Sequence, residues 1–204
     1  MGTSLIPVGN HNIQYKGRNF QDIASEIKEI LNDCKFPNSE FLRTFALRWY
    51  GEDDTQMIRK IDDKREWTFF EEDEYFTYEK WKQIEFEGPF TLGLSFYESQ
   101  IVLDNPPYRY WQWFELKDAI ARNEWRKYMQ CIITALGGDR VIYLADNGTH
   151  LEEFMFYDGS FEELEQALFN KLGAPKTTFE AVAADFDNAY FIDNFKTIDN
   201  SSLL

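Results

Sequence analysis

The chain has 204 residues, of which 44% are hydrophobic and 18% aromatic, and it carries a formal net charge of −15. So much apolar material in a chain of this length excludes global disorder and predicts a single domain, 1–204, with a substantial core. The apolar run at residues 131–136, even counting Thr134, is far shorter than the roughly 20 residues of a membrane-spanning helix, so we expect no membrane association.

The negative charge makes attachment to nucleic acid or to an anionic membrane surface unfavourable, and it favours a basic protein as partner. The alternative is that the charge only keeps the protein in solution. Residues 1–10 carry no signal-peptide pattern, which predicts a cytoplasmic location. Cys34 and Cys131 are the only cysteines, and their wide separation in the sequence predicts two reduced, buried thiols rather than a disulfide.

In chain order, the first predicted elements are a short strand over residues 13–16 and a helix that begins after Asn19. Asn19 is a favourable N-cap, and Asp22 lies in the positive first turn of the helix. The apolar residues of this helix recur at helical spacing on one side. They are Phe20, Ile23, Ala24, Ile27, Ile30 and Leu31.

Residues 41–50 fit either of two structures. A helix behind Ser39 would align Leu42, Phe45, Ala46 and Trp49 on one face. A strand would align Arg43, Phe45, Leu47 and Trp49 on one side. We favour the strand, because residues 51–54 then form a turn into a second short strand at 57–61.

Successive aromatic or β-branched runs follow between residues 66 and 114, separated by short polar, Gly or Pro stretches. The runs are 67–70, 75–78, 90–96, 100–103 and 108–114. Residues of these types are enriched in strands, and the short breaks are typical of hairpins. This region therefore predicts an antiparallel meander that forms the main sheet.

A long helix centred on Tyr128 is predicted next, with Gly137 and Gly138 as its stop signal. Residues 141–145 predict a strand, and the Asp-Asn-Gly sequence at 146–148 predicts a hairpin turn into a returning strand at 151–157.

Ser160 and Glu163 form a capping box in front of the next helix, which Gly173 and a following proline end. The tail predicts a short helix over 179–186 and an apolar run at 189–192 before a frayed end. These elements predict an α+β fold with a mostly antiparallel sheet and about three helices packed on one face. The three are the helices of Asn19, Tyr128 and Ser160.

The residues needed for common catalytic and cofactor motifs are missing. His11 and His150 are the only histidines, neither has a second ligand at metal-binding spacing, and both are expected in exposed loops. Glycine-rich phosphate loops do not occur. A calcium loop starting at Asp185 fails at Tyr190, where Gly is required, and at Lys196, where Glu is required. We therefore predict no catalytic residue, no cofactor and no metal.

The most acidic stretch spans residues 52–74, which contain ten carboxylates but only four basic residues, Arg59, Lys60, Lys64 and Arg65. Such a stretch either forms ordinary solvated loops or docks a basic partner. The carboxylates are Glu52, Asp53, Asp54, Asp62, Asp63, Glu66, Glu71, Glu72, Asp73 and Glu74. Seven of them are candidate partner-binding residues, namely Glu52, Asp53, Asp54, Glu71, Glu72, Asp73 and Glu74.

A second candidate region is the aromatic segment 106–115. As a strand it would carry large rings on both sides, so it is either a central strand covered twice or a strand with one face at a binding surface. The candidate partner-binding residues here are Tyr108, Tyr110, Trp111 and Trp113.

Two functions fit these features. The first is a protein-binding module without catalytic activity, of the kind that immunity proteins and antitoxins represent, which inhibits a basic partner. The alternative is a hydrolase that acts on a carbohydrate or similar neutral substrate through a pair of carboxylates in an aromatic cleft. The hydrolase requires a concave pocket with two inward carboxylates, and the inhibitor requires exposed carboxylates beside an aromatic anchor. The sequence leaves the oligomeric state undetermined.

Overall fold

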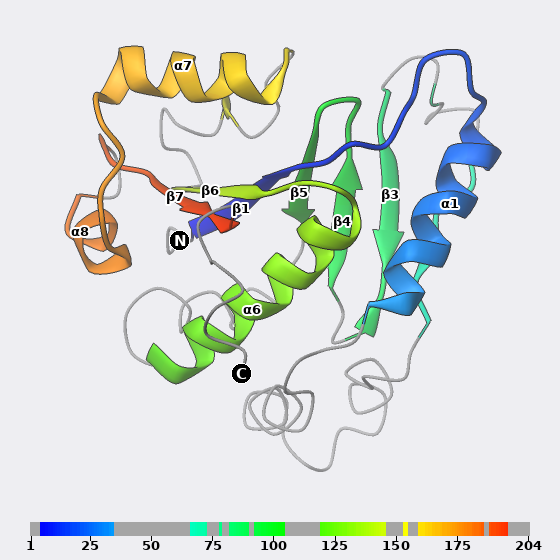
Figure 1. The fold of residues 1–204 in the computed structure, drawn as a ribbon, viewed down its shortest axis with the longest axis horizontal. Helices are drawn as coiled ribbons and strands as arrows, with labels where there is room; N and C mark the ends of the chain where they lie inside the picture. The colour runs from blue at the N-terminus through cyan, green and yellow to red at the C-terminus, as the bar shows by residue number, and fades with distance from the viewer. Residues whose placement is uncertain are drawn as a thin grey trace.

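The computed structural model describes residues 5–34, 66–72, 78, 82–89, 92–104, 119–145, 153–154, 159–185 and 188–195. Within them the chain forms a seven-stranded sheet and four α-helices (Figure 1). The strands are β1 (Leu5–Asn10), β2 (Thr68–Phe69), β3 (Ile84–Glu87), β4 (Gly93–Phe96), β5 (Gln100–Asp104), β6 (Arg140–Ala145) and β7 (Phe191–Asn194). The helices are α1 (Phe20–Asp33), α6 (Ala119–Ala135), α7 (Phe161–Leu172) and α8 (Phe179–Ala183).

The strand order is β2-β3-β4-β5-β1-β6-β7, and each of the six pairings between neighbouring strands is antiparallel. Strands β2 to β5 are neighbours in chain order, as the predicted meander requires. The α+β class with an antiparallel sheet is therefore confirmed. The N-terminal strand β1 lies between β5 and β6 in the middle of the sheet, so it joins the meander to the C-terminal strands.

Three helix ends follow the predicted local signals. The side chain of Asn19 accepts a hydrogen bond from the Asp22 backbone N–H at the start of α1. At the start of α7, Ser160 and Glu163 form both hydrogen bonds of the capping box. Gly137, just past α6, has a φ of +79°, the left-handed conformation in which Gly costs least.

Four strand predictions need correction. The first strand is β1 at residues 5–10 rather than 13–16, because residues 5–10 pair with strands on both sides. Tyr78 is helical rather than extended. β3 was not predicted, although its burial alternates with the period of a strand. Residues 153–154 form a 3-10 turn, because β1 and β7 occupy the two edges of β6 where the predicted returning strand would pair.

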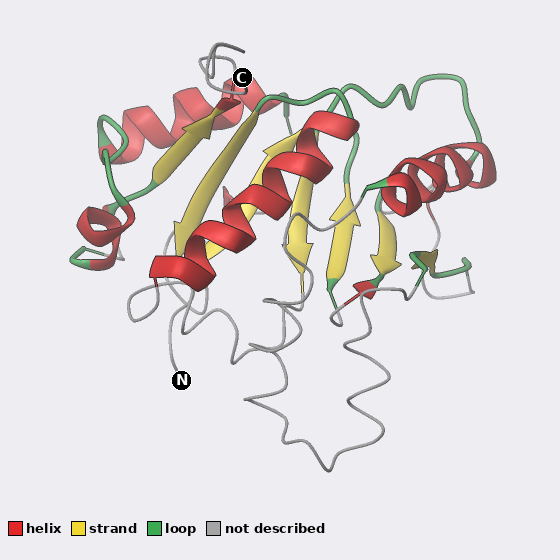
Figure 2. Cartoon of the chain, turned by 60° about the horizontal axis from the view of Figure 1, so that its bottom comes forward, coloured by secondary structure: helices red, strands yellow, loops and turns green. Residues whose placement is uncertain are grey.

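The placement of the helices differs from the expectation of a single covered face. Helices α1 and α6 share one core cluster with the inward residues of β3, β4 and β5. Helix α7 contributes Phe161, Leu164 and Leu168 to a second cluster, with Ile6 and Val8 of β1. Alternate residues of a strand point to opposite faces, so these two clusters lie on opposite sides of the sheet (Figures 1 and 2). The central strands are thus buried on both sides.

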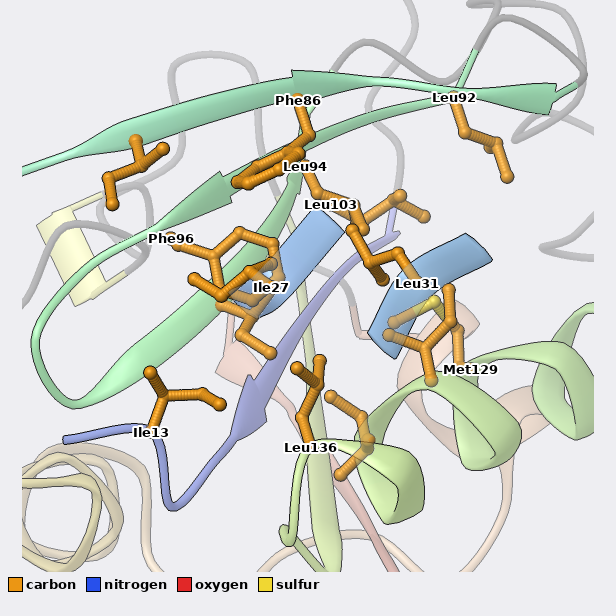
Figure 3. Close-up of a cluster of buried hydrophobic side chains, with 14 of the residues drawn as sticks. Ile13, Ile27, Leu31, Phe86, Leu92, Leu94, Phe96, Leu103, Met129 and Leu136 are labelled. Atoms are coloured by element: carbon orange, nitrogen blue, oxygen red, sulfur yellow. The ribbon is translucent and has the colours of Figure 1, made fainter. Parts of the chain in front are cut away.

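The larger cluster contains the aromatic and aliphatic residues that hold α1 and α6 on the sheet (Figure 3). Phe86 and Phe96 meet edge to face at 5.2 Å between ring centroids. Gly9 of β1 permits the close approach of α6, because a Cβ at this position would lie 2.2 Å from Cδ1 of Ile133. A second contact fixes α6 at the β7 edge, where Arg126 donates two hydrogen bonds to Asp193.

Candidate functional site

The sequence-predicted partner-binding residues are only partly described by the structure. Glu71 and Glu72 are exposed in the segment that follows β2. The other candidates lie outside the described residues, namely Glu52, Asp53, Asp54, Asp73, Glu74, Tyr108, Tyr110, Trp111 and Trp113. The segments 41–50 and 108–114 and His150 lie outside them as well. The site is therefore built from the residues around Glu71 and Glu72.

The segment from Trp67 to Glu71 runs alongside α1 in the opposite direction. Near the end of the helix, the Trp67 backbone N–H donates to Oδ1 of Asn32 at 2.7 Å. Near its start, Nε2 of Gln21 donates to Oε2 of Glu71 at 2.8 Å. These two bonds are 11 residues apart on the helix, so the segment follows α1 over about 16 Å. The edge strand β2 and helix α1 consequently present a joint surface.

Four carboxylates follow the outward side of α1. Asp22, Glu26, Glu29 and Asp33 are spaced i, i+4, i+7 and i+11, which aligns them in one row on a helix. The first, third and fourth are exposed, and Glu26 is half-buried and paired with Arg18. The first and last members of this row, Asp22 and Asp33, directly follow Gln21 and Asn32, the two residues of α1 that contact the neighbouring segment. We call these four carboxylates the α1 row.

Phe70 is an exposed apolar side chain in the segment beside α1, next to Glu71. It is 52% exposed, while its neighbour Phe69 packs inward against Phe20 and Phe86. The Phe70 backbone N–H donates to Glu85 O at 3.0 Å, so its backbone is held by the sheet although its ring faces outward. Large exposed aromatic rings are typical anchors of protein interfaces. We use the term acidic surface for Phe70 together with the carboxylates of α1 and of the neighbouring segment 66–72: Asp22, Glu26, Glu29, Asp33, Glu66, Glu71 and Glu72.

A cavity of about 570 Å³ opens at the N-terminal end of α1, next to the acidic surface. The rings of Phe20 and Tyr78 line it, together with Arg18 and Lys82, whose ammonium lies 4.9 Å from the Tyr78 ring centroid. Its one carboxylate, Glu72, accepts a hydrogen bond from the Tyr78 backbone N–H. The described part of this cavity therefore lacks the carboxylate pair that hydrolysis of a glycoside requires.

A second cavity, of about 350 Å³, lies along α6. It also contains a single carboxylate, Glu124, which is paired with Lys127 at 2.8 Å. Both described cavities thus hold one carboxylate that already has a partner. No group of His, Cys, Asp and Glu within the described ranges could hold a metal ion.

The second group of carboxylates belongs to α7 and is bound internally. The Arg140 guanidinium pairs with Asp139 at 3.2 Å, with Glu162 at 2.7 Å and with Glu165, and it lies 5.2 Å from the ring centroid of Phe161. We call the charged residues Arg140, Asp139, Glu162 and Glu165 the Arg140 network. Hydrogen bonding to Arg140 lowers the pKa of Glu162, whereas burial raises the pKa of Glu165.

Divergent pKa values in a carboxylate pair can indicate acid–base catalysis. In the Arg140 network, however, one guanidinium contacts both carboxylates and an aromatic ring covers it. The arrangement therefore ties α7 to β6 and leaves neither group directed at a substrate.

His11 is buried rather than exposed in a loop. Its Nε2 donates to Tyr97 O at 2.9 Å, and its Nδ1 accepts from the Ile13 backbone N–H at 3.1 Å. Both ring nitrogens are satisfied by the neutral ring, and burial lowers the pKa of His11. His11 is thus a structural tie between β1 and the β4–β5 hairpin.

Comparisons with protein-family models, with curated proteins and with solved structures found no match to this chain. In the part of the chain that the structure describes, no helix is long and apolar enough to cross a membrane. The four carboxylates of the α1 row were not predicted as a site from the sequence, although their spacing of three and four residues is the signal that aligns them on one side of a helix.

Proposed function

We propose that the protein is a cytoplasmic protein-binding module without catalytic activity, which docks and inhibits a basic protein through the acidic surface. The observation that carries the proposal is that two acidic segments lie side by side, the carboxylate row of α1 and residues 66–72 with the half-exposed ring of Phe70. Charge of one sign accelerates encounter with a partner of opposite charge, and a central aromatic ring supplies contact energy. Immunity proteins and antitoxins represent this mode of action.

The charge of the whole chain supports the same kind of partner. A formal net charge of −15 attracts a basic protein over distances comparable to the Debye length, about 10 Å at moderate salt. It also disfavours nucleic acid and anionic membranes as partners. Within the described residues, only one of the four carboxylates of the α1 row forms an ion pair, Glu26 with Arg18. The other three can therefore pair with cationic side chains of a partner, which would make binding specific.

The test is affinity capture at low salt from an extract of the native host, with three forms of the full-length protein. The surface variant Glu29→Gln/Asp33→Asn removes two negative charges from the α1 row. The matched control Gln166→Lys/Asn170→Lys changes the net charge by the same amount on the exposed side of α7. A captured basic protein is then purified, and its binding kinetics and its activity are measured with each form.

We expect the wild type and the control to retain the same basic protein, to inhibit it, and to associate with it several times faster than the surface variant. Phe70→Ala should weaken the complex about tenfold, mainly through faster dissociation. If the surface variant and the control lost association rate equally, net charge alone would explain the binding, and the proposed docking on the acidic surface would be wrong. The proposal fails if no basic protein is retained by the wild type at low salt.

A further inference from the structure

The only two cysteines of the chain meet in space where α1 packs beside α6. Cys34 directly follows the last turn of α1, and its backbone N–H is bonded to Ile30 O and Leu31 O. Its Sγ lies 4.0 Å from the carbonyl oxygen of Cys131, a residue 97 positions later in the C-terminal half of α6. The two cysteines were predicted to be separate because they are far apart in the sequence, but the fold brings them close together.

The helices that carry the two cysteines are held together by their apolar sides. Leu31 of α1 and Met129 of α6 belong to the same core cluster (Figure 3). Both cysteines are half-buried rather than fully buried, so a small reagent can reach them. Neither takes part in a metal-ligand group among the described residues. The pair thus combines proximity, a rigid support and access.

We propose that Cys34 and Cys131 form an intrachain disulfide that staples the C-terminal end of α1 to α6 when a disulfide-bearing oxidant is present. The inference does not depend on the proposed function. The bond requires the two Cα atoms within about 7 Å of each other. The contact of the Cys34 Sγ with the Cys131 backbone oxygen supports this proximity, and Cys34 lies beyond the last helical residue, so the bond would require a rotation of the Cys131 side chain and a shift of Cys34.

The reaction is two thiol–disulfide exchanges with a reagent such as glutathione disulfide. The thiolate of one cysteine attacks the reagent, forms a mixed disulfide and releases one glutathione thiolate. The thiolate of the other cysteine then attacks the protein sulfur of that mixed disulfide and releases the second glutathione thiolate. Two electrons and two protons pass from the protein dithiol to the reagent, which becomes two glutathione molecules.

The environment of the thiols determines the character of this bond. Burial raises the pKa of Cys34 to about 11, with a further contribution from Cys131, and burial also raises the pKa of Cys131. Few thiolates are present near neutral pH, so the bond forms slowly. Thiols of high pKa are poor leaving groups, so the disulfide is also reduced slowly. The pair therefore acts as a durable staple rather than as a rapid redox catalyst.

The experiment incubates the reduced, full-length protein with excess glutathione disulfide at mildly alkaline pH and measures the intact mass, the free thiol content and the thermal midpoint. We expect a monomer that has lost two hydrogen atoms, carries no glutathione and has no free thiol. Its Tm should rise by about 10 °C, because the staple restricts a loop of 97 residues in the unfolded chain. Reduction with dithiothreitol should reverse both changes.

Cys34→Ser and Cys131→Ser serve as matched controls, since each removes one sulfur and keeps a similar side-chain volume. Each should take up one glutathionyl group and show no rise in Tm. The inference is overturned if the wild type takes up two glutathionyl groups, keeps two free thiols, or forms covalent dimers. It is also overturned if the oxidised protein is less stable than the reduced one.

Discussion

The two acidic regions of the molecule use their carboxylates in opposite ways. In the Arg140 network, Glu162 and Glu165 of α7 share one guanidinium and fix the helix to the sheet. On the acidic surface, Glu29 and Asp33 have no ion pair within the described part of the chain and project outward from α1. Carboxylates that are paired internally contribute to stability, whereas unpaired ones of like charge reduce it slightly. This difference in pairing is the reason for proposing α1, rather than α7, as the partner-binding region.

The largest effect is expected from Arg140→Met, which removes the cation from three carboxylates while keeping an extended apolar side chain. Glu165 and Asp139, whose side chains are largely buried, would then lose their shared cation, so the free energy of unfolding should fall by about 3 kcal/mol in urea denaturation. Arg18→Met is the matched change on the acidic surface. It removes an ion pair with a half-exposed carboxylate and two exposed hydrogen bonds to the backbone oxygens of Gln14 and Asp22, and it should cost less than about 1 kcal/mol. Equal costs at both sites would contradict the comparison.

A smaller effect should appear as the pH falls, and it should begin at His11 before it reaches the Arg140 network. The pKa of His11 in the folded protein is lowered below its ordinary value of 6.5, so the unfolded state binds a proton first. Stability is therefore fully present above pH 6.5 and is lost as the pH falls toward the lower folded pKa, by at most about 1.4 kcal/mol per pH unit. The lowered pKa of Glu162 has the same sign but acts only below its ordinary value of 4.5.

The variant His11→Asn separates these two phases. Its side-chain oxygen can still accept from the Ile13 N–H, while the bond to Tyr97 O is lost, so we expect a cost of about 1 kcal/mol at neutral pH. Urea denaturation at a series of pH values should show a flatter stability profile between about pH 7 and 5 than in the wild type. This range brackets the ordinary His pKa of about 6.5, at which the unfolded wild-type chain takes up its proton. An unchanged slope would show that His11 is not the group that titrates.

The smallest effect is expected from Glu29→Gln/Asp33→Asn, the variant that tests partner binding. Removal of a like-charged i,i+4 pair should raise the free energy of unfolding by about 0.3 kcal/mol at low salt. High salt should abolish the gain, because exposed charges are screened. Thermal denaturation at two salt concentrations measures this difference. A clear loss of stability would instead indicate that the α1 row supports the fold.

Local signals predicted the helices well and the sheet less completely. Asn19, Ser160 and Glu163 satisfy backbone groups within a few residues of themselves, so their roles are readable without knowledge of the fold. The short strand β3 was missed although Ile84 and Phe86 alternate with glutamates, because four residues carry a weak signal. The strand expected at 151–157 required a free edge of β6, but β1 and β7, which are distant in the sequence from each other, pair with both edges of β6.

Of the partner-binding residues predicted from the sequence, Glu71 and Glu72 lie in the described segment beside α1. The α1 row was visible as a periodic pattern, but nothing local indicated that α1 would lie beside the segment that contains Phe70. That placement depends on hydrogen bonds between residues about 35 to 50 positions apart, Asn32 with Trp67 and Gln21 with Glu71. Contacts of this kind are selected by the packing of the whole core rather than by either segment alone.

The sequence by itself determined the α+β class, the three long helices with their caps and the acidic character of the protein. These properties follow from composition, periodicity and hydrogen bonds that act over a few residues. Only the tertiary structure decided that β1 lies between β5 and β6, that α7 covers the face opposite α1 and α6, and that Cys34 meets Cys131. The physical reason is that strand order and helix placement depend on burying both faces of one sheet at once, and no single segment carries that information.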